Sequence, residues 1–510
     1  MKLLAPLYAA MRIPYQRIRR VQMHPLEGQR YWLKYLVRKG AGTAFGKKLG
    51  ITANLTYETF RQRVPVQPYE VLYPWIERML RGEPDVLYPG SVRWFAKSSG
   101  TTNDRSKYIP IPADSLRYNH FRAARDMFAT YLTLYREDTQ LLEGKIISIG
   151  GSHAIGPMGP QARCGDLSAV LLANMPSFYR FFRAPSLEIA LLPKWEEKLP
   201  RMTEALLAQR ESIVGLAGVP TWTVLLFDAL LRRTGATNML GVFPRFEVFF
   251  HGAVSFTPYE ATFRQYFPTP RVRYLEIYNA SEGFFAFQDT SATKDMLLLT
   301  DHGVFYEFIP LEHWEAGRWE AVPLEEVRVG VGYAMVITTV GGLWRYLIGD
   351  TVRFTSINPY RIRILGRTRH YINAFGEEVM IEQAEAALKA ACEATGARVR
   401  DYTVAPIYLH ARSRGAHEWL IEFIRPPDDI ERFKDVLDHT LRQLNSDYDA
   451  KREADLALTP PQIVMLPEGT FYRWLKSKGK LGGQNKVPRL SNDRQYVEEI
   501  RAYTALSDSV

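Results

Sequence analysis

Short, nearly continuous apolar runs recur along this chain, and they restrict its choice of folds more than any other feature. The runs are five to seven residues long and rich in β-branched and aromatic residues. Such runs are typical of strands that helices cover on both faces. The sequence therefore predicts several buried strands, at KIISIG (145–150), FEVFF (246–250), RYLEIY (273–278), YAMVITT (333–339) and RYLIGD (345–350).

Helical patterns lie between these runs. Apolar side chains at helical spacing predict a helix over 113–135, and the apolar positions of 201–233 predict helical structure there as well. An alternation of strands with helices favours sheets that are largely parallel. The fold class we expect is α/β, with a large N-terminal domain of mixed or parallel sheets flanked by helices.

The pattern changes near Gly366. A helical stretch from residue 381 is followed by two strand-like runs, DYTVAPIYL (401–409) and WLIEFI (419–424), and then by another helical stretch. This order predicts a small α+β domain, and Pro, Gly and Arg residues mark the boundary before it. A chain of 510 residues has room for more than one domain. We expect an N-terminal domain over 1–367 and a mobile C-terminal lid domain over 368–510.

Composition excludes several classes of protein. The net charge of +10 would suit an anionic partner, but the basic residues are scattered and no nucleic-acid motif appears, so we expect no nucleic acid partner. No apolar run is long enough for a membrane span, so we expect no membrane association. Pro6 and Arg12 interrupt the apolar start of the chain, which predicts an amphipathic first helix and not a signal peptide. The only cysteines, Cys164 and Cys392, have no metal spacing, which favours a reducing cytoplasm. We expect a monomer.

The segment AKSSGTTNDRSKYIPIP (96–112) is the first that points to chemistry. Its four hydroxyl side chains surround a glycine, whose missing side chain lets backbone N–H groups approach a ligand. Phosphate binds well to such donors when a cation is near. The segment is not a Walker A loop, and an ordinary polar turn is the alternative. The residues concerned are Ser98, Ser99, Gly100, Thr101 and Thr102, with Arg105 or Lys107 as the cation.

Three further polar clusters each follow a strand-like run. In Asn279-Ala280-Ser281-Glu282-Gly283, the carboxylate is well placed to hold a divalent cation that bridges phosphates. Asp350 can accept hydrogen bonds from both hydroxyls of a ribose. The small residues of His251-Gly252-Ala253 leave room for a flat ring. The structural alternatives are a solvated turn, an ordinary Gly-Asp turn and a buried structural histidine.

The tail contains a glycine-rich basic loop, KGKLGGQNKVPR (478–489), which is either solvated surface or a phosphate-binding element. Its polar residues are Lys478, Lys480, Gln484, Lys486 and Arg489. Other chemistries find no support, because the chain has no G-x-S-x-G, H-E-x-x-H or C-x-x-C motif.

Taken in order, these clusters resemble the motifs of adenylate-forming enzymes, and more closely those of the plant auxin-responsive (Gretchen Hagen) family of acyl acid amido synthetases. SSGTTNDRSKYIP resembles the family's phosphate-loop motif SSGTT-x-G-x-x-K-Y-x-P, and EIYNASEG resembles its Y-x-S-S-E motif. GGLWRYLIGDTVRF resembles G-L-Y-R-Y-R-x-G-D, and the tail resembles G-T-F … Q-Y-K-x-P-R. The departures include Asn103-Asp104 in the first motif, Ala280 for serine in the second, and Thr368-Arg369 at the junction between domains.

The resemblance implies that the chain activates a carboxylic acid with ATP and Mg²⁺. It implies that Ser98, Ser99, Gly100, Thr101, Thr102 and Lys107 bind phosphates, with Ser281 nearby, that Glu282 holds Mg²⁺, and that Asp350 binds the ribose. It further implies that Gly252, Ala253 and Tyr278 surround the adenine, that Lys486 on the lid reaches the α-phosphate, and that Phe121, Val219, Trp222 and Phe284 line the acyl pocket. Thr102, Glu282 and Lys486 are the expected catalytic residues.

The chemistry that follows is adenylation and transfer. Attack of the carboxylate on the α-phosphorus of ATP gives an acyl-AMP, whose phosphate monoester is a better leaving group than oxide. The amine that attacks next is expected to be that of an amino acid. Transfer to coenzyme A, as in an acyl-CoA ligase, and a non-catalytic nucleotide sensor are the alternatives.

Overall fold

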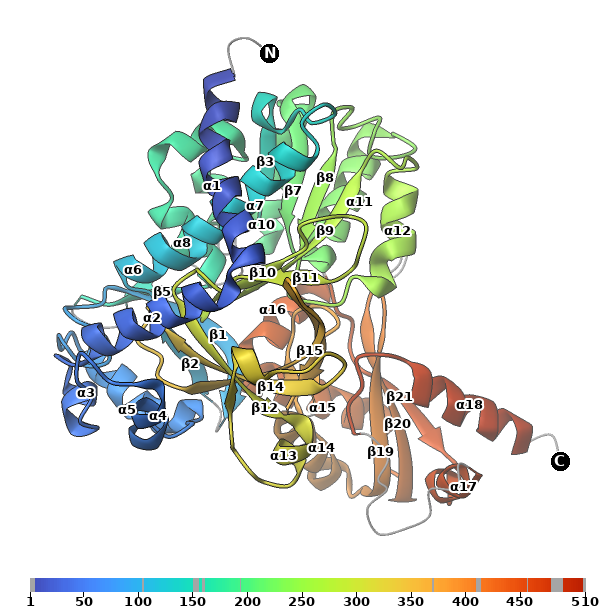
Figure 1. Ribbon diagram of the computed structural model, residues 1–510. Coiled ribbons are helices and arrows are strands. Elements are labelled where there is room, and N and C mark those ends of the chain that lie inside the picture. Colours follow the sequence, from blue (N-terminus) through green and yellow to red (C-terminus); the bar gives the residue numbers. More distant parts are fainter. Residues whose placement is uncertain are drawn as a thin grey trace.

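The predicted apolar runs form strands of one long sheet in the computed structural model, and the fold is α/β (Figure 1). Parallel pairing joins five strands of this sheet in the order β6–β3–β7–β8–β9. Strand β8 (Val248–His251) is buried at every position, as a strand covered on both faces must be. The others are β3 (Lys145–Ser148), β6 (Arg183–Ala184), β7 (Ile213–Gly218) and β9 (Arg273–Ala280). The structure describes residues 5–102, 105–149, 156–157, 161–192, 194–368, 371–409, 414–455, 457–477 and 489–507.

The same sheet continues as an antiparallel half. Ser281 and Glu282 make a two-residue turn between β9 and β10, since Ala280 pairs directly with Gly283. Within the described residues the sheet contains twelve strands, in the order β13-β12-β14-β15-β16-β11-β10-β9-β8-β7-β3-β6. The strands of this half are β10 (Gly283–Phe287), β11 (Met296–Leu298), β12 (Val304–Pro310), β13 (Val322–Pro323), β14 (Gly332–Thr339), β15 (Tyr346–Ile357) and β16 (Tyr360–Arg367).

The Ser/Thr-rich segment lies in a second sheet, of order β2-β1-β5-β4 among the described strands. The sequence predicts a loop at residues 98–102, but their backbone belongs to strand β1, which pairs antiparallel with β2. The register shifts between Ser98 and Thr102, so the segment is an irregular strand end and not a free turn. The strands are β1 (Trp94–Thr102), β2 (Arg105–Pro110), β4 (Gly156–Pro157) and β5 (Arg163–Gly165).

Helices cover both sheets of the N-terminal part (Figure 1). The expected first helix is present, and Arg17 on it forms an ion pair of 3.1 Å with the buried Asp126. No helix among the described residues has the length and apolar character that crossing a membrane requires. The helices are α1 (Ala5–Met23), α2 (Pro25–Gly40), α3 (Ala44–Lys48), α4 (Tyr57–Arg63), α5 (Tyr69–Leu80), α6 (Ala113–Ser115), α7 (Phe121–Leu134), α8 (Leu167–Asn174), α9 (Leu187–Ala190), α10 (Trp195–Leu207), α11 (Pro220–Thr234), α12 (Glu260–Tyr266) and α13 (Leu311–Glu315).

The helical prediction over 201–233 is partly wrong. Strand β7 separates α10 from α11, and Ile213 and Leu216, which fit the helical spacing, lie on this strand. Both residues are fully buried, on a strand that pairs with β8 on one side and β3 on the other. A short apolar run that is buried on both faces cannot be distinguished from a helical segment by periodicity alone. The helix predicted over 113–135 is confirmed as α6, a π-helical turn at Leu116–His120, and α7.

The C-terminal part is a small α+β unit, as predicted (Figure 1). Asp429 caps α15 by accepting hydrogen bonds from the N–H groups of Glu431 and Arg432, which explains where this helix begins. Its elements are β17 (Tyr371–Ile372), β18 (Val379–Met380), α14 (Ile381–Thr395), β19 (Arg398–Ile407), β20 (Ala416–Arg425), α15 (Ile430–Leu444), α16 (Ser446–Arg452), β21 (Gln462–Leu466), α17 (Thr470–Ser477) and α18 (Gln495–Ser507).

The two parts pack against each other through a shared apolar core. One hydrophobic cluster contains Tyr259 of the N-terminal part together with Phe375 of the C-terminal part. The Tyr259 hydroxyl, fully buried, donates a hydrogen bond of 2.6 Å to the carbonyl of Ala374. Asn373 donates another, of 3.1 Å, to the carbonyl of Ala253 at the end of β8. The loop that follows the junction is therefore docked on the carboxyl end of the parallel strands.

Candidate active site

Lys107 brings a half-buried cation to the Ser/Thr-rich segment. It lies on β2 opposite Ser98, so the hairpin places it directly beside the predicted phosphate loop. Its ammonium lies 3.5 Å from the Tyr346 hydroxyl and 5.6 Å from the ring centre of Tyr69. Burial lowers the pKa of Lys107, and the nearby Glu282 opposes that shift. The side chains of residues 98–102 lie outside what the structure describes.

Glu282 lies at the tip of the β9–β10 turn and is only 8% exposed. The Tyr346 hydroxyl donates a hydrogen bond of 3.4 Å to its carboxylate. Burial raises the pKa of Glu282, while the charge of Lys107 acts in the opposite direction. A carboxylate taken out of water in this way gains from a cation that joins it.

A single buried carboxylate fits the way in which proteins hold Mg²⁺, since this ion is usually bound by one or two carboxylates together with phosphates and waters. The described residues contain no group of three or more His, Cys, Asp or Glu side chains of the kind that would hold a metal ion without a ligand's help. Glu282 therefore suits a metal that arrives with a nucleotide.

Asp350 is the residue that the third motif brings to the site, and it is also 8% exposed. Its carboxylate accepts a hydrogen bond of 2.5 Å from the Tyr278 hydroxyl and forms an ion pair of 3.0 Å with Arg367. Gly349, directly before it, has a φ of +94°, a conformation that favours glycine. Asp350 is thus held from both sides, by the second motif and by the last strand before the junction.

Arg367 connects this site to the C-terminal part. Besides Asp350 it contacts the Glu378 carboxylate at 2.9 Å, and it lies 5.4 Å from the ring centre of Tyr371. Sequence reasoning did not select Arg367, although it stands in the Gly-Arg pair at the end of β16. The two carboxylates that hold it, Asp350 and Glu378, lie in different segments of the chain. Nothing in the sequence around Arg367 therefore shows that it has these partners.

At the end of β8, Gly252 is required by packing. A Cβ atom there would lie 2.4 Å from the carbonyl oxygen of Ile277 on β9, so the room that its missing side chain leaves is taken by the neighbouring strand. Ala253 has a φ of +71°, which places its peptide groups in an unusual orientation beside the sheet. His251 is a buried structural histidine: it stacks on Phe256 at 4.0 Å between ring centres, and burial lowers its pKa to about 3.

The four predicted acyl-pocket residues fall into two groups. Phe284 is buried in a cluster with α7, and its N–H donates a hydrogen bond of 2.6 Å to the Asn119 side chain; Phe121 begins α7 and is half-buried. Val219 and Trp222 lie at the start of α11, where the Trp222 ring contacts Trp195 at 4.4 Å and the Lys451 ammonium at 5.2 Å. Within the described part of the chain no ring contact joins the two groups.

The predicted lid residues fall mostly outside the described part of the chain. Lys478, Lys480, Gln484 and Lys486 lie there, as does Arg369. Arg489, at the end of the same loop, forms an ion pair with Asp401 and donates a hydrogen bond of 3.1 Å to the carbonyl of Tyr402. This arginine therefore ties the end of the loop to β19.

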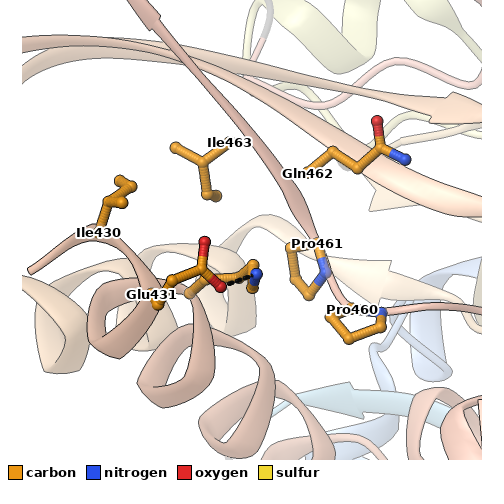
Figure 2. Close-up of a pocket in the computed structure, with 7 residues that line it drawn as sticks. Ile430, Glu431, Pro460, Pro461, Gln462 and Ile463 are labelled. Carbon is orange, nitrogen blue, oxygen red and sulfur yellow. Dashed lines mark hydrogen bonds and ion pairs between the residues drawn. The ribbon is translucent and has the colours of Figure 1, made fainter.

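A surface pocket of about 360 Å³ lies elsewhere, between the start of α15 and strand β21 (Figure 2). Its lining combines apolar side chains with the ion pair of Glu431 and Lys434. None of the motif residues lies in it, so it is not the site that the sequence predicts. The residues that line it are Ile430, Glu431, Lys434, Pro460, Pro461, Gln462 and Ile463.

Two solved ligases share the architecture of this chain. A solved acyl acid amido synthetase, AtGH3.15 in complex with 2,4-DB, matches with a TM-score of 0.64 and 17% identity, over 97% of this chain and 96% of that one. A 2-hydroxyisobutyryl-CoA ligase in complex with 2-HIB-AMP and CoA matches with a TM-score of 0.56 and 14% identity, over 95% of this chain and 93% of that one. At these identities the likeness shows a shared fold.

Family models narrow the class further. The models for the N-terminal, central and C-terminal domains of the GH3 family match residues 14–272, 297–367 and 382–495. The chain belongs to the GH3 family, and the resemblance seen in the motifs is confirmed. Among its relatives are an indole-3-acetic acid-amido synthetase of Oryza sativa subsp. indica, 23% identical over 89% of this chain and 86% of that protein, and a 4-substituted benzoates-glutamate ligase of Arabidopsis thaliana, 21% identical over 85% of this chain and 87% of that protein.

Proposed function

We propose that this protein is an ATP-dependent acyl acid amido synthetase that converts a carboxylic acid into an acyl-AMP and transfers the acyl group to an amino acid. The observation that supports it most is the convergence of the half-buried Lys107 with the buried Glu282 and Asp350 in one cluster. These residues come from three separate motifs. The Tyr346 hydroxyl links Lys107 to Glu282, and burial together with the nearby charge of Asp350 raises the pKa of Glu282. A cation, a metal-binding carboxylate and a ribose-binding carboxylate are the groups that an adenylation site needs.

The chain's own residues would share the first step as follows. Lys107, with the Ser98–Thr102 segment, holds phosphate oxygens and offsets their negative charge, which is the main task of a phosphoryl-transfer site. Asp350 accepts hydrogen bonds from the ribose hydroxyls and orients the nucleotide. Glu282 would hold Mg²⁺, which supplies positive charge to the phosphates when bound.

The second step needs an acceptor at the acyl carbon, and we propose that residues 368–510 act as a lid over both steps. Lys486, on this lid, would reach the α-phosphate during adenylation. The residues that would line the path of the acyl group are Phe121, Phe284, Val219 and Trp222. The apolar docking of Tyr259 on the Ala374–Phe375 loop supports a stable closed arrangement of the two parts. Domain closure of this kind excludes water from a reactive acyl-AMP.

An acyl-CoA ligase is the second candidate, supported by the TM-score of 0.56 to the 2-hydroxyisobutyryl-CoA ligase over most of both chains.

Both free cysteines, Cys164 and Cys392, suit a reducing compartment, and we propose a cytoplasmic monomer.

Pyrophosphate release with a panel of aryl, indolyl and fatty acids, together with hydroxylamine trapping, tests acid activation. The absence of both signals with every acid would refute enzymatic function.

A further inference from the structure

Tyr346 lies between the two charged groups that the proposed site places on the phosphates. Its hydroxyl accepts a hydrogen bond of 3.5 Å from the Lys107 ammonium and donates one of 3.4 Å to the Glu282 carboxylate. No direct ion pair of 4.0 Å or less joins Lys107 to Glu282 within the described part of the chain. The tyrosine is therefore the group through which the cation and the carboxylate contact each other.

Glu282 is buried and Lys107 is half-buried, so without a spacer the two charges would attract each other strongly. At about 4 Å, opposite unit charges gain far more in a partly desolvated site than in water. An ion pair between Lys107 and Glu282 would occupy the ammonium that phosphate needs and the carboxylate that a metal needs. A neutral hydroxyl between them prevents this loss, and it still satisfies hydrogen-bonding groups on both sides.

The backbone around Tyr346 is clamped, which suits a side chain that must hold its place. The Gln67 main chain accepts a hydrogen bond of 2.9 Å from the N–H of Leu347 and donates one of 3.0 Å to the carbonyl of Arg345. The Gln67 side chain donates another, of 2.9 Å, to the carbonyl of Trp344. Tyr346 itself is fully buried.

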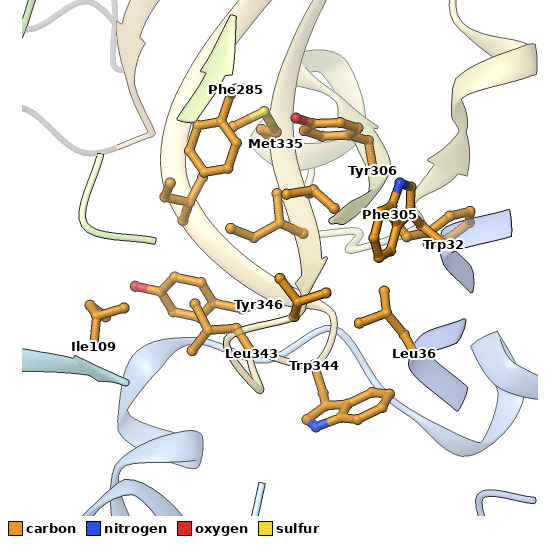
Figure 3. Close-up of a cluster of buried hydrophobic side chains, with 14 of the residues drawn as sticks. Trp32, Leu36, Ile109, Phe285, Phe305, Tyr306, Met335, Leu343, Trp344 and Tyr346 are labelled. Atoms are coloured by element: carbon orange, nitrogen blue, oxygen red, sulfur yellow. The ribbon is translucent and has the colours of Figure 1, made fainter. Parts of the chain in front are cut away.

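Arg345 adds a second restraint. It has a φ of +40°, an unusual conformation for a residue with a side chain, and such strain persists only where the surroundings hold it. Its guanidinium binds both oxygens of the buried Glu307, at 2.8 and 2.9 Å, and also the carbonyl of Val64 at 2.8 Å. Figure 3 shows the result: the Tyr346 ring lies in the apolar cluster, and its hydroxyl points to the side where Ile109 of β2 lies.

From these contacts we infer that Tyr346 is a positioning residue, which keeps Lys107 and Glu282 apart and directed toward the metal-bound phosphates of ATP. The inference rests on the proposed function, because it assigns phosphate and Mg²⁺ to those two side chains. It predicts that loss of the hydroxyl weakens the response to magnesium and nucleotide and leaves the response to the acid unchanged.

The test is Tyr346→Phe, compared with Tyr306→Phe. Tyr306 is also fully buried, lies in the same apolar cluster, and its hydroxyl bonds only to the carbonyl of Leu299 within the described residues, at 3.4 Å (Figure 3). Tyr346→Phe should raise the Mg²⁺ concentration for half-maximal pyrophosphate exchange, and the KM for ATP, about tenfold. The KM for the acid should stay within about twofold, and Tyr306→Phe should leave all three values unchanged.

A double-mutant cycle shows whether the effect passes through the lysine. If the hydroxyl matters because its loss lets Lys107 pair with Glu282, the Tyr346→Phe change should have little further effect in a Lys107→Met background. Full additivity, or an unchanged Mg²⁺ requirement in Tyr346→Phe, would overturn the inference. Should Tyr346→Phe not fold, Gln67→Ala is the second variant, because it removes the side-chain hydrogen bond to the carbonyl of Trp344 near Tyr346. It should shift the Mg²⁺ requirement in the same direction by a smaller factor.

Failure of the proposed function gives a different result from failure of this inference. If the wild-type protein shows no acid-dependent exchange, calorimetric titration of ATP with and without Mg²⁺ still compares Tyr346→Phe with the wild type. A wild-type protein that exchanges pyrophosphate normally, with a Tyr346→Phe variant of equal Mg²⁺ and ATP dependence, refutes the positioning role alone.

Discussion

The Tyr278 hydroxyl donates a hydrogen bond of 2.5 Å to the Asp350 carboxylate, and both side chains are buried. The bond joins two motifs that are 72 residues apart in the sequence. It fixes the carboxylate that we assign to the ribose beside β9, the strand that precedes the turn with Glu282. Desolvation and the neighbouring Asp350 charge raise the pKa of Tyr278, so its hydroxyl stays a proton donor at all pH values of interest.

The ribose assignment predicts a specific loss in Asp350→Asn. The asparagine keeps the size of the side chain but loses the charge, which weakens two hydrogen bonds to the ribose hydroxyls. We expect the KM for ATP in pyrophosphate exchange to rise about tenfold to a hundredfold, with the KM for the acid unchanged. Tyr278→Phe removes the bond to Asp350 without removing the charge, so it should raise the KM for ATP by a smaller factor. An unchanged KM for ATP in Asp350→Asn would refute the assignment.

Removal of magnesium should stop the first step. EDTA is expected to abolish acid-dependent pyrophosphate exchange, and added Mg²⁺ should restore it. Glu282→Gln keeps the shape of the turn but loses the buried charge. Its exchange rate should fall by about 10² at saturating Mg²⁺, the usual loss for one charge-stabilising group. Exchange that continues at the same rate in EDTA would contradict the role of Glu282.

The lid assignment predicts that loss of Lys486 slows adenylation but not acyl transfer. Lys486→Ala should slow adenylation by about 10²–10³, because one charge-stabilising contact is lost. The same variant should use chemically supplied acyl-AMP at nearly the wild-type rate, since the α-phosphate is then already the leaving group. Alanine variants of Lys478 and Lys480, in the same loop, are the matched controls. If one of these two is slow and Lys486→Ala is not, the role moves to that lysine; if all three are unaffected, the lid takes no part in adenylation.

The pKa of Glu276 predicts how the free energy of unfolding depends on pH. Burial raises its pKa to about 7, against the opposing charges of Lys294 and Arg363. The native state therefore holds this proton at pH values where the unfolded chain has lost it, so the contribution to stability is present below about pH 4.5 and is lost as the pH rises through about 7.

Glu276→Gln removes this titration while keeping the size of the side chain. The free energy of unfolding of the variant should rise relative to that of the wild type as the pH increases from about 5 to about 8.5. At the upper end of this range the gain should be about 2 kcal/mol or somewhat less. The melting temperatures of both proteins across this range check the expectation. Glu188→Gln, at an exposed carboxylate, should show no such change with pH. A constant difference between Glu276→Gln and the wild type would contradict the burial of an unpaired carboxyl at this position.

Much of the fold and part of the site could be predicted from the sequence. The continuous apolar runs became strands β3, β8, β9, β14 and β15, because burial on both faces leaves little else for such runs to do. The motifs also selected Lys107, Glu282 and Asp350, which the fold brings together.

The connections between these residues could not be predicted, because they depend on contacts over long distances in the chain. Tyr346 is 239 residues from Lys107, and an aromatic residue at the start of a strand is otherwise typical of the core. Strand β7 was missed since Ile213 and Leu216 fit a helical spacing as well as a buried strand. The packing reason for Gly252 was also hidden in the sequence, because a Cβ there would lie 2.4 Å from the carbonyl oxygen of Ile277 on the next strand.

The most direct test of the proposed amide synthesis follows the acyl group to its product. The protein is incubated with ATP, Mg²⁺, an acid that supports pyrophosphate release, and either a mixture of amino acids or coenzyme A, and the products are identified by mass spectrometry. We expect an N-acyl amino acid, formed together with equal amounts of AMP and pyrophosphate, and no acyl-CoA. Formation of the acyl-CoA thioester from the same acid, with no amide from any amino acid, would contradict the proposal.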